Sequence, residues 1–287
     1  MKIVMTLLVR DEEDILADVV DFHLARGVDF IIVTDNLSRD RTPEILDHYR
    51  RRGVMQVIQE PRDDYMQHAW VTKMARIAAV EHGADWVINS DADEFWLPDA
   101  HGASLKDVFA DIPTASAAVE VARDNFPIVP TAIAETAPFF ERLTWRDTQS
   151  IQAMGRPLPP KVAHRADALV EVAQGNHSVR SNGADVSCCN APVRIVHCPA
   201  RSYRQFYRKI ELGGAAYSRN TALSPSVGKT WRVLYEALLE GRLPAEFQRH
   251  NPDVAEFAAQ VASGRLVQDY RLRDALRSIR ETSKVIR

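Results

Sequence analysis

The chain has 287 residues, of which 46% are hydrophobic and 26% are charged. Those proportions are ordinary for a globular enzyme, and the length fits one large α/β domain, or one such domain with a helical appendage. The formal net charge of −3 gives no electrostatic reason to expect a nucleic-acid partner.

The cysteines and the N-terminus favour an intracellular setting. An odd number of cysteines without regular spacing, at Cys188, Cys189 and Cys198, argues against a disulfide scaffold and fits a reducing compartment. Adjacent cysteines also lack the spacing of a zinc site. The apolar run before Arg10 is far shorter than the ~20 residues of a membrane span. We therefore expect a cytoplasmic protein.

Strands and helices alternate in the first third of the chain. This spacing favours a doubly wound, mostly parallel sheet. The expected strands are Ile3–Val9, Phe30–Thr34, Val54–Ile58 and Asp85–Asn89, and the expected helices are Ile15–Arg26, one that begins at Thr42, and Trp70–His82.

The pattern changes after residue 98. The Pro-rich stretch 125–160 suits a substrate-facing loop region or short antiparallel strands. Further strands are expected at Ala117–Val121, Ala168–Val172 and Val193–His197, and helices at Tyr203–Ser218, Lys229–Glu240, Val254–Ser263 and Asp269–Lys284.

Carboxylates follow two of the predicted strands directly. Asp91, Asp93 and Glu94 come after the fourth strand, and Asp35 comes directly after the second. An α/β sheet binds its ligand beyond the carboxyl ends of its strands, and carboxylates placed there suit a divalent cation that sits on substrate phosphates. The alternatives are a solvated acidic turn for the first group and a capped turn for Asp35.

Three segments occur together with a characteristic order and spacing. They are MTLLVRDEEDIL (5–16), VTDNLSRDRTPEIL (33–46) and ADWVINSDADEFW (84–96). Together they resemble the family 2 glycosyltransferases, in particular a bacterial subgroup with a DxDEF-type signature. The segments PKVAHRAD (160–167), GNHSV (175–179) and HCPARSYRQFYRKIELGGAAY (197–217) extend the resemblance. That family often has Asn-Glu where this chain has Asp11-Glu12.

The resemblance implies a GT-A fold, which is a Rossmann-like, mostly parallel sheet with flanking helices. We expect a catalytic, nucleotide-sugar-binding domain over residues 1–200 and a helical C-terminal extension packed on it over residues 201–287. The implied reaction moves a sugar from a nucleoside diphosphate sugar, usually a UDP-sugar, to a saccharide or lipid-linked acceptor. The family usually inverts the sugar's configuration and uses Mn²⁺ or Mg²⁺.

Mapped onto this chain, the resemblance assigns roles to five early residues. Asp35 would read the nucleoside, with Arg10 and Glu12 nearby in the donor pocket. Asp91 would contact the ribose or a metal-bound water, and Asp93 would bind the metal directly.

Later residues complete the expected donor site. His177 is the first candidate for an additional metal ligand, with His164 and His197 as competitors, and a structural histidine is the alternative for each. Lys161 and Arg165 could contact phosphate oxygens, or be surface cations.

An inverting transferase needs a general base for the acceptor hydroxyl. Asp124, Glu141, Asp147 and Glu171 qualify by position, and Asp124 and Glu141 rank first. Asp124 closes a predicted strand. Glu141 follows Pro138-Phe139-Phe140, an apolar setting that would raise the pKa of a base.

Other functions stay open at this point. A nucleotidyltransferase on a similar sheet would also use Asp-x-Asp and a metal, although the chain has no Gly-rich phosphate loop after the first strand. A non-catalytic nucleotide-sugar-binding protein would share the fold. The basic segment Asp269–Arg287 could rest on acidic lipid, but its thin apolar face favours a solvated or dimer-forming helix.

Overall fold

The computed structural model describes residues 1–152, 155–221, 223–224 and 227–285. The chain forms two compact units. Unit 1 comprises residues 1–62, 66–123 and 159–195, and unit 2 comprises residues 63–65, 124–158 and 196–287. The expected division at residue 200 remains a prediction.

A seven-stranded sheet forms the centre of unit 1. Its strands are β1 (Ile3–Val9), β2 (Phe30–Asp35), β3 (Met55–Gln59), β4 (Trp86–Asp91), β6 (Ala118–Val121), β9 (Lys161–Arg165) and β13 (Cys188–Asn190). They lie in the order β13-β6-β9-β4-β1-β2-β3. The pairs β4–β1, β1–β2, β2–β3 and β13–β6 are parallel, whereas β9 runs antiparallel to both of its neighbours.

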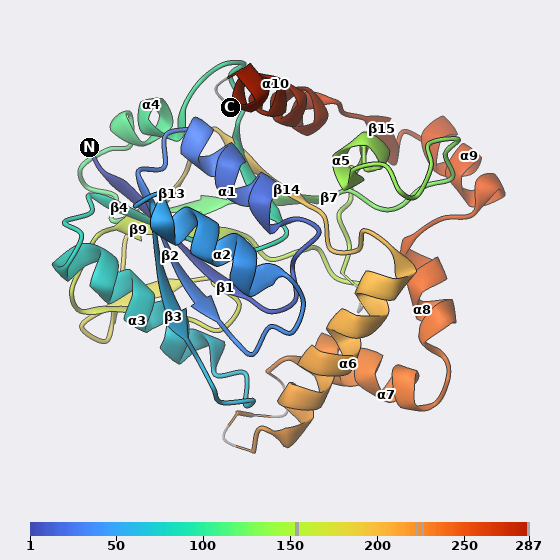
Figure 1. The fold of residues 1–287 in the computed structure, drawn as a ribbon, viewed down its shortest axis with the longest axis horizontal. Helices are drawn as coiled ribbons and strands as arrows, with labels where there is room; N and C mark the ends of the chain where they lie inside the picture. The colour runs from blue at the N-terminus through green and yellow to red at the C-terminus, as the bar shows by residue number, and fades with distance from the viewer. Residues whose placement is uncertain (153–154, 222, 225–226, 286–287) are drawn as a thin grey trace. The chain divides into compact units, whose positions relative to one another are not determined.

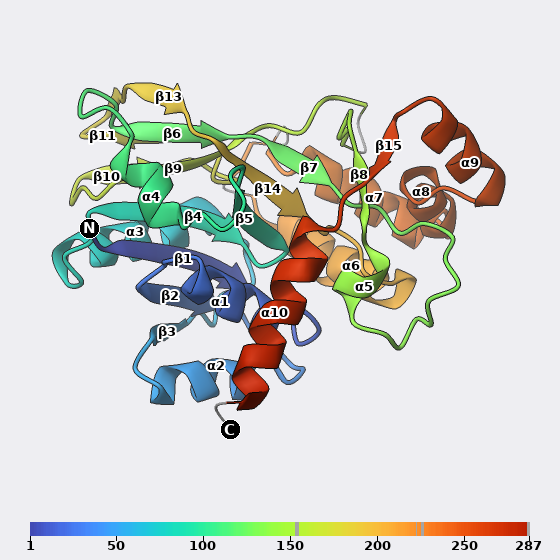
Figure 2. The same cartoon turned by 90° about the horizontal axis from the view of Figure 1, so that it is seen from above.

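The helices of unit 1 flank this sheet (Figures 1 and 2). They are α1 (Leu16–Ala25), α2 (Thr42–Arg51), α3 (Gln67–Val80) and α4 (Leu105–Ala110). Helix α3 packs on β1, β2 and β4, where Val71 and Met74 join Val4, Ile32 and Val87 in one buried cluster. These strand residues share one face because side chains alternate along a strand. The expected α/β fold, with a mostly parallel sheet and flanking helices, is confirmed.

Shorter strands form further small sheets. Strands β5 (Glu94–Pro98), β14 (Val193–His197) and β7 (Arg123–Asn125) form one three-stranded sheet, and β10 (Val170–Val172), β11 (Val179–Ser181) and β12 (Ala184–Asp185) form another. Strands β5 and β9 were not predicted. Both carry charged residues of the site described below.

Unit 2 is largely helical after residue 200, as the sequence predicts. Its elements are α5 (Phe139–Arg142), β8 (Trp145–Asp147), α6 (Tyr203–Arg219), α7 (Lys229–Leu239), α8 (Leu243–His250), α9 (Val254–Ala262), β15 (Leu266–Gln268) and α10 (Arg271–Val285). Helices α6, α7 and α8 share a small core of Ile210, Leu234 and Leu243. A Cβ on Gly213 of α6 would lie 2.5 Å from the Trp231 ring of α7, so this glycine permits the close approach of the two helices.

Through residue 282, the part of the C-terminal helix whose side chains are described, the apolar face is packed within unit 2. Leu272 and Leu276 are buried, and α10 packs on α5 within unit 2. The apolar surface that a lipid contact would need is therefore covered. The last two residues of the basic segment lie outside the described part of the chain. None of the described helices combines the length and apolar character needed to cross a bilayer.

Candidate functional site

The carboxyl ends of three neighbouring strands bring two of the predicted acids to one edge of the unit 1 sheet. In the parallel registers, Asp35 pairs with Val9 and Asp91 pairs with Leu8, so the two acids flank β1. Two strand spacings separate them, which corresponds to about 10 Å. This is the edge at which α/β sheets bind ligands.

The loops after β1 and β2 are bound to each other. Asp11, whose φ of 55° is left-handed, accepts hydrogen bonds from the backbone N of Arg39 (2.7 Å) and of Asp40 (3.2 Å) through Oδ1. The backbone N of Asp11 donates to Oγ of Ser38 at 3.0 Å. An Asp tolerates this backbone better than most side chains because it can hydrogen-bond locally. Asp11 in the first loop thus holds the second loop in place through these hydrogen bonds.

The predicted donor-pocket residues lie in these two loops. Asp35 is buried, and its Oδ1 accepts a hydrogen bond from the backbone N of Ser38 at 3.2 Å, so it caps its own turn. Nη1 of Arg10 lies 3.5 Å from Oδ1 of Asn36. Glu12 is buried, and its backbone N donates to Oγ1 of Thr42. The structure brings these residues together at the sheet edge, and their roles toward a donor remain predictions.

A chain of alternating charges begins at Asp91. Nζ of Lys161 lies 2.5 Å from Oδ2 of Asp91 and 3.3 Å from Oε1 of Glu94. Nη1 of Arg123 lies 3.2 Å from the same Glu94 oxygen. The side chains of Lys161 and Glu94 are 1% and 0% exposed, so these ions compensate each other away from water. The sequence grouped Glu94 with the metal-site acids, whereas the structure makes it an internal counter-ion.

The other oxygen of Asp91 is held by two side-chain amides. Nε2 of Gln67 and Nδ2 of Asn176 each donate to Oδ1 of Asp91 at 3.2 Å. Oε1 of Gln67 in turn accepts a hydrogen bond from the backbone N of Gly175 at 3.0 Å. The loop that contains His177 is therefore tied to the acidic site. Neither amide was singled out from the sequence, although Asn176 lies in the GNHSV motif.

Burial and charge act in opposite directions on the two acids of this cluster. Burial alone raises the pKa of Asp91, but the Lys161 ammonium, with help from Arg123, outweighs burial and holds that pKa below its ordinary value. Burial also raises the pKa of Glu94, and there it prevails over the same two cations. Asp91 is therefore ionised near neutral pH and able to hold a cation or accept hydrogen bonds.

His177 has the tautomer of a metal ligand. Its Nδ1 lies 2.8 Å from the carbonyl oxygen of Pro160, which can only accept, so Nδ1 carries the proton. Burial, with the charge of Lys161, lowers the pKa of His177 to about 4 and keeps the ring neutral near pH 7. The lone pair is then on Nε2. Metal-binding histidines usually donate their other N–H to a carbonyl or carboxylate in this way.

The residues fit a cation that is shared with a substrate. Asp91 has a 35% exposed side chain, whereas Asp93 is buried. Among the described residues, no three His, Cys, Asp or Glu side chains converge on a common point. Mg²⁺ is usually held by one or two carboxylates together with substrate phosphates and water, which needs no such cage.

Three other predicted candidates have structural roles. His164 is buried in β9, and burial lowers its pKa to about 4. Arg165 donates hydrogen bonds to the carbonyl oxygens of Ser116, Ile112 and Pro113. His197 belongs to unit 2, where its Nδ1 lies 2.7 Å from Oδ1 of Asn125. The structure fits a structural histidine at position 164, whereas Arg165 is half-buried and bound to backbone carbonyls, unlike a surface cation, and its contact with phosphate remains a prediction.

The two base candidates lie in unit 2. Asp124 is buried, and Nη1 of Arg146 lies 3.9 Å from its Oδ2. Glu141 accepts hydrogen bonds from Nε and Nη2 of Arg277. The purely apolar setting expected for Glu141 is therefore wrong, because α10 places a guanidinium against it. Their assignment as bases remains a prediction, as do those of Asp147, which is buried, and Glu171, which is exposed on β10.

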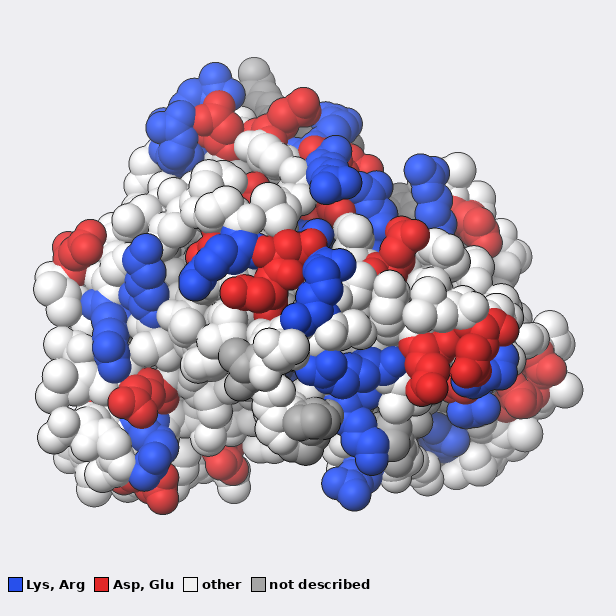
Figure 3. Space-filling model, turned by 90° about the horizontal axis from the view of Figure 1, so that it is seen from below, with Lys and Arg blue, Asp and Glu red and all other residues white. Residues whose placement is uncertain are grey.

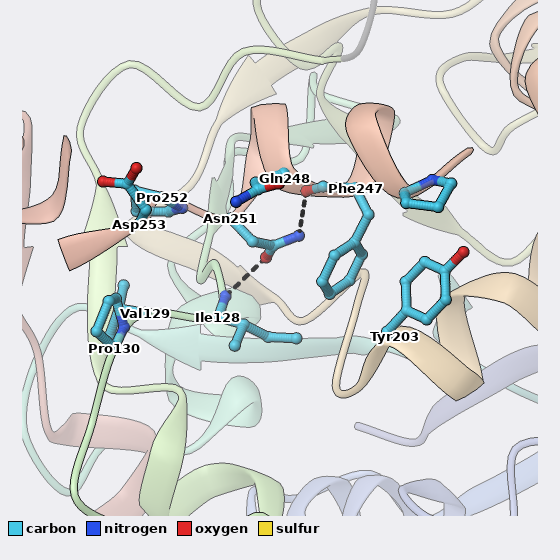
Figure 4. A pocket seen from close by; sticks show the side chains of 10 residues that line it. Ile128, Val129, Pro130, Tyr203, Phe247, Gln248, Asn251, Pro252 and Asp253 are labelled. Carbon is cyan, nitrogen blue, oxygen red and sulfur yellow. Dashed lines mark hydrogen bonds between the residues drawn. The ribbon is translucent and has the colours of Figure 1, made fainter. Parts of the chain in front are cut away.

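Unit 2 also contains an open pocket of about 430 Å³ (Figure 4). Asn251 joins its two walls, because its Oδ1 accepts a hydrogen bond from the backbone N of Ile128 and its Nδ2 donates to the carbonyl oxygen of Phe247. Tyr203 packs edge-on against Phe247 at 5.2 Å between ring centroids. None of the predicted site residues lines this pocket.

Acidic and basic side chains lie next to each other over the face drawn in Figure 3. This distribution accords with the small net charge of −3.

The sequence matches the profile of glycosyltransferase family 92 over residues 4–213. The chain belongs to glycosyltransferase family 92. This confirms the predicted enzyme class, a transferase of glycosyl groups, whereas the predicted resemblance to a family 2 subgroup with a DxDEF-type motif is not confirmed. The matched region contains the acidic site of unit 1, including Asp35, Asp91, Lys161 and His177.

Solved structures of glycosyltransferases are distantly similar to this chain. TarS residues 1–349 from S. aureus shares 13% identity over 100% of this chain and 92% of that chain, with a TM-score of 0.43. Its complex with UDP-GlcNAc shares 13% identity over 99% and 92% of the two chains, with a TM-score of 0.38. Glucosyl-3-phosphoglycerate synthase from Mycobacterium tuberculosis, in complex with Mn²⁺, UDP and phosphoglyceric acid, shares 16% identity over 58% and 57%, with a TM-score of 0.33. No curated protein sequence matches the chain significantly.

Proposed function

We propose that this family 92 member moves a sugar from a nucleoside diphosphate sugar to a hydroxyl group of a saccharide or lipid-linked acceptor. The observation that carries the proposal is the pair of acids, Asp35 and Asp91, held on either side of β1 at the carboxyl edge of the sheet. Family membership supplies the reaction class. UDP as the nucleotide, inversion of configuration and a role in polysaccharide biosynthesis rest on the resemblance to family 2.

In this proposal the donor extends along the sheet edge. Asp35 accepts hydrogen bonds from the nucleoside, with Arg10 and Glu12 beside it in the bound loops. Lys161 lies at the other end, next to Asp91, where its ammonium suits a diphosphate oxygen. The spacing of about 10 Å between the two acids leaves room for a nucleoside whose phosphates point toward Asp91.

A divalent cation, Mn²⁺ or Mg²⁺, fits next to Asp91. Asp91 would hold it through its partly exposed carboxylate, donor phosphates and water would complete its coordination, and Asp93 and Nε2 of His177 are the candidates for one further ligand. Such a cation supplies Lewis-acid stabilisation of the charge that develops on the leaving diphosphate. The hydrogen bond from Nδ1 of His177 to Pro160 fixes the ring so that its lone pair stays available.

The transfer step needs a proton acceptor and a stabilised leaving group. The acceptor oxygen attacks the anomeric carbon, the bond between that carbon and the phosphate oxygen breaks, and the nucleoside diphosphate leaves with the electron pair. The base, Asp124 or Glu141, takes the hydroxyl proton. Attack opposite to the leaving group inverts the configuration. Lys161 stabilises negative charge that is greater in the transition state than in the bound donor.

A turnover assay tests the proposal. Wild-type protein with Mn²⁺ and a panel of UDP-sugars should release UDP, and Asp91→Asn should reduce that release by about 100-fold or more, the effect of losing one group that stabilises transition-state charge. Asp185→Asn is the matched control, because Asp185 lies on β12 with a 93% exposed side chain. Comparison of Asp124→Asn with Glu141→Gln identifies the base.

The rival functions give different results in the same assay. A non-catalytic binding protein would bind UDP but release none from any sugar donor. A nucleotidyltransferase would consume a nucleoside triphosphate and release pyrophosphate. Either result contradicts the proposed function.

A further inference from the structure

Lys161 is almost fully buried, yet it contacts a carboxylate that opens to solvent. Its side chain is 1% exposed, while that of its nearest partner Asp91 is 35% exposed. The second partner, Glu94, is 0% exposed. A buried ammonium with partners on two sides can lose one ion pair and keep the other. Lys161 therefore has two unlike partners, Glu94, which is buried, and Asp91, which is accessible at the ligand site.

We infer that Lys161 is an exchangeable counter-cation, which holds Asp91 while the site is empty and transfers to the donor's diphosphate when a divalent cation binds Asp91. The inference rests on the proposed function and adds to it the change of partner that Lys161 makes when the metal binds. Lys161 thereby serves two partners, one in each state of the enzyme.

Crowding at Asp91 is the first argument. The ammonium lies 2.5 Å from Oδ2, and two amides already donate to Oδ1. A bound Mg²⁺ lies about 2.0–2.1 Å from its ligand oxygens, and a second positive charge at the same oxygen would be strongly repelled. A cation that binds Asp91 through Oδ2 must therefore displace Lys161. The four-carbon stem of a lysine permits such a movement of the ammonium without a backbone change.

Glu94 and Arg123 make the exchange possible. Oε1 of Glu94 lies 3.3 Å from Nζ of Lys161, so the ammonium keeps a counter-ion after it leaves Asp91. Arg123 contacts the same Glu94 oxygen, and its Nε donates to the carbonyl oxygen of Pro159, close in sequence to Lys161. Oε2 of Glu94 also accepts a hydrogen bond from the backbone N of Asp91. Glu94 is thus a positioning residue that keeps Lys161 within reach of the site.

A simple structural ion pair predicts a different outcome. If Lys161 only stabilised the fold, its replacement would weaken every ligand at the site together, through loss of the local structure. In an exchange, the same replacement strengthens one ligand and weakens the other. The cation alone gains a free Asp91, whereas the nucleotide loses a positive charge beside its diphosphate.

The test measures two affinities by calorimetry, that of Mn²⁺ without nucleotide and that of UDP at saturating Mn²⁺. Lys161→Met should bind Mn²⁺ about tenfold more tightly and UDP about tenfold more weakly than wild type, as expected for one opposite charge within a few Å. Lys161→Arg, which keeps the charge, should move both values back toward wild type. Lys106→Met is the control, because Lys106 makes an equally short pair of 2.5 Å with Asp29 at an exposed position.

The possible outcomes distinguish a failure of the exchange from a failure of the proposed function. Changes of opposite sign in Lys161→Met support the exchange, and affinities that both fall or both stay unchanged overturn it. Lys161→Gln, which keeps a hydrogen-bond donor in a similar volume, replaces Lys161→Met if the latter does not fold. Wild-type protein that binds neither Mn²⁺ nor UDP overturns the proposed function, whereas wild-type binding with unshifted variants overturns the exchange alone.

Discussion

Nζ of Lys161 and Oδ2 of Asp91 lie 2.5 Å apart although the two residues are 70 positions apart in the sequence. The contact exists because β9 inserts antiparallel next to β4 in an otherwise parallel region of the sheet. It joins the acidic motif to a later basic motif. The resulting site combines a partly exposed carboxylate with a buried ammonium, which suits an anionic, metal-bound diphosphate.

Removal of the charge on Arg123 should destabilise unit 1. Arg123→Gln leaves Glu94 with one cation fewer in a buried position where burial already raises its pKa, and breaking a buried pair in this way typically costs about 3–5 kcal/mol. Urea unfolding of the variant measures the loss. Lys106→Gln breaks the exposed pair with Asp29 and should cost less than about 1 kcal/mol. Equal losses in the two variants would mean that the buried cluster contributes no more than a surface pair.

A methyl group at Gly175 should displace the His177 ring. Gly175 has a φ of 82°, and a Cβ there would lie 2.5 Å from Nε2 of His177, the atom expected to face a metal. Gly175→Ala should lose about 1–2 kcal/mol through backbone strain and, in addition, most of its thermal stabilisation by Mn²⁺.

Gly183→Ala is the matched control for this variant. Gly183 has a similar φ of 74°, but a Cβ there meets no atom within 4 Å. Gly183→Ala should lose stability through the same backbone strain but keep its thermal stabilisation by Mn²⁺. If both variants retain that response, His177 is not a metal ligand.

Acid should destabilise the fold through its buried histidines. Nδ1–H of His23 donates to Val19 O and Nε2 accepts from the backbone N of Trp96, so the folded state holds a neutral ring. Burial lowers the pKa of His23 to about 4, and that of His164 likewise. Between the ordinary value of 6.5 and about 4, the unfolded chain binds more protons than the folded one. The free energy of unfolding should therefore fall as the pH drops through this window, by up to about 3 kcal/mol for each ring.

Urea denaturation at a series of pH values measures this dependence. His23→Gln should flatten the slope between pH 6.5 and 4 relative to wild type. His101→Gln, at an exposed position, should leave the slope as it is. A slope that is unchanged in His23→Gln would contradict the role of this ring.

Much of the fold follows from the sequence because hydrophobic strands and turn residues alternate locally. The apolar runs that form β1, β2 and β4 are evident from composition alone, and each ends where a polar residue begins. Strand β9 is not evident, since it begins with Lys161, contains His164 and ends with Arg165, yet is buried along most of its length. Its burial depends on Asp91 and Glu94, which no local pattern can supply.

The candidate site, too, is predictable only as far as local patterns determine it. The Asp-x-Asp motif and the strand ends placed Asp35 and Asp91 correctly at one edge. The sequence groups Glu94 with Asp91 and Asp93 because all three follow the same strand, but the side chain of Glu94 lies inside unit 1 against two cations. Trp96, which follows the acids in the sequence, is buried, and its Nε1 donates to Oγ of Ser90. The direction of each side chain depends on strand pairing, which the sequence does not display.

The most direct test of the central claim is a thermal-shift panel of UDP, GDP, CDP and dTDP, each with and without Mn²⁺, on wild type and Asp91→Asn. A ligand present at about 100 times its dissociation constant should stabilise the fold by about 2.7 kcal/mol. We predict a rise in melting temperature with UDP that requires Mn²⁺ and is lost in Asp91→Asn. The absence of a shift with every nucleotide, or a UDP shift that Asp91→Asn leaves intact, would contradict a donor site at the end of β4.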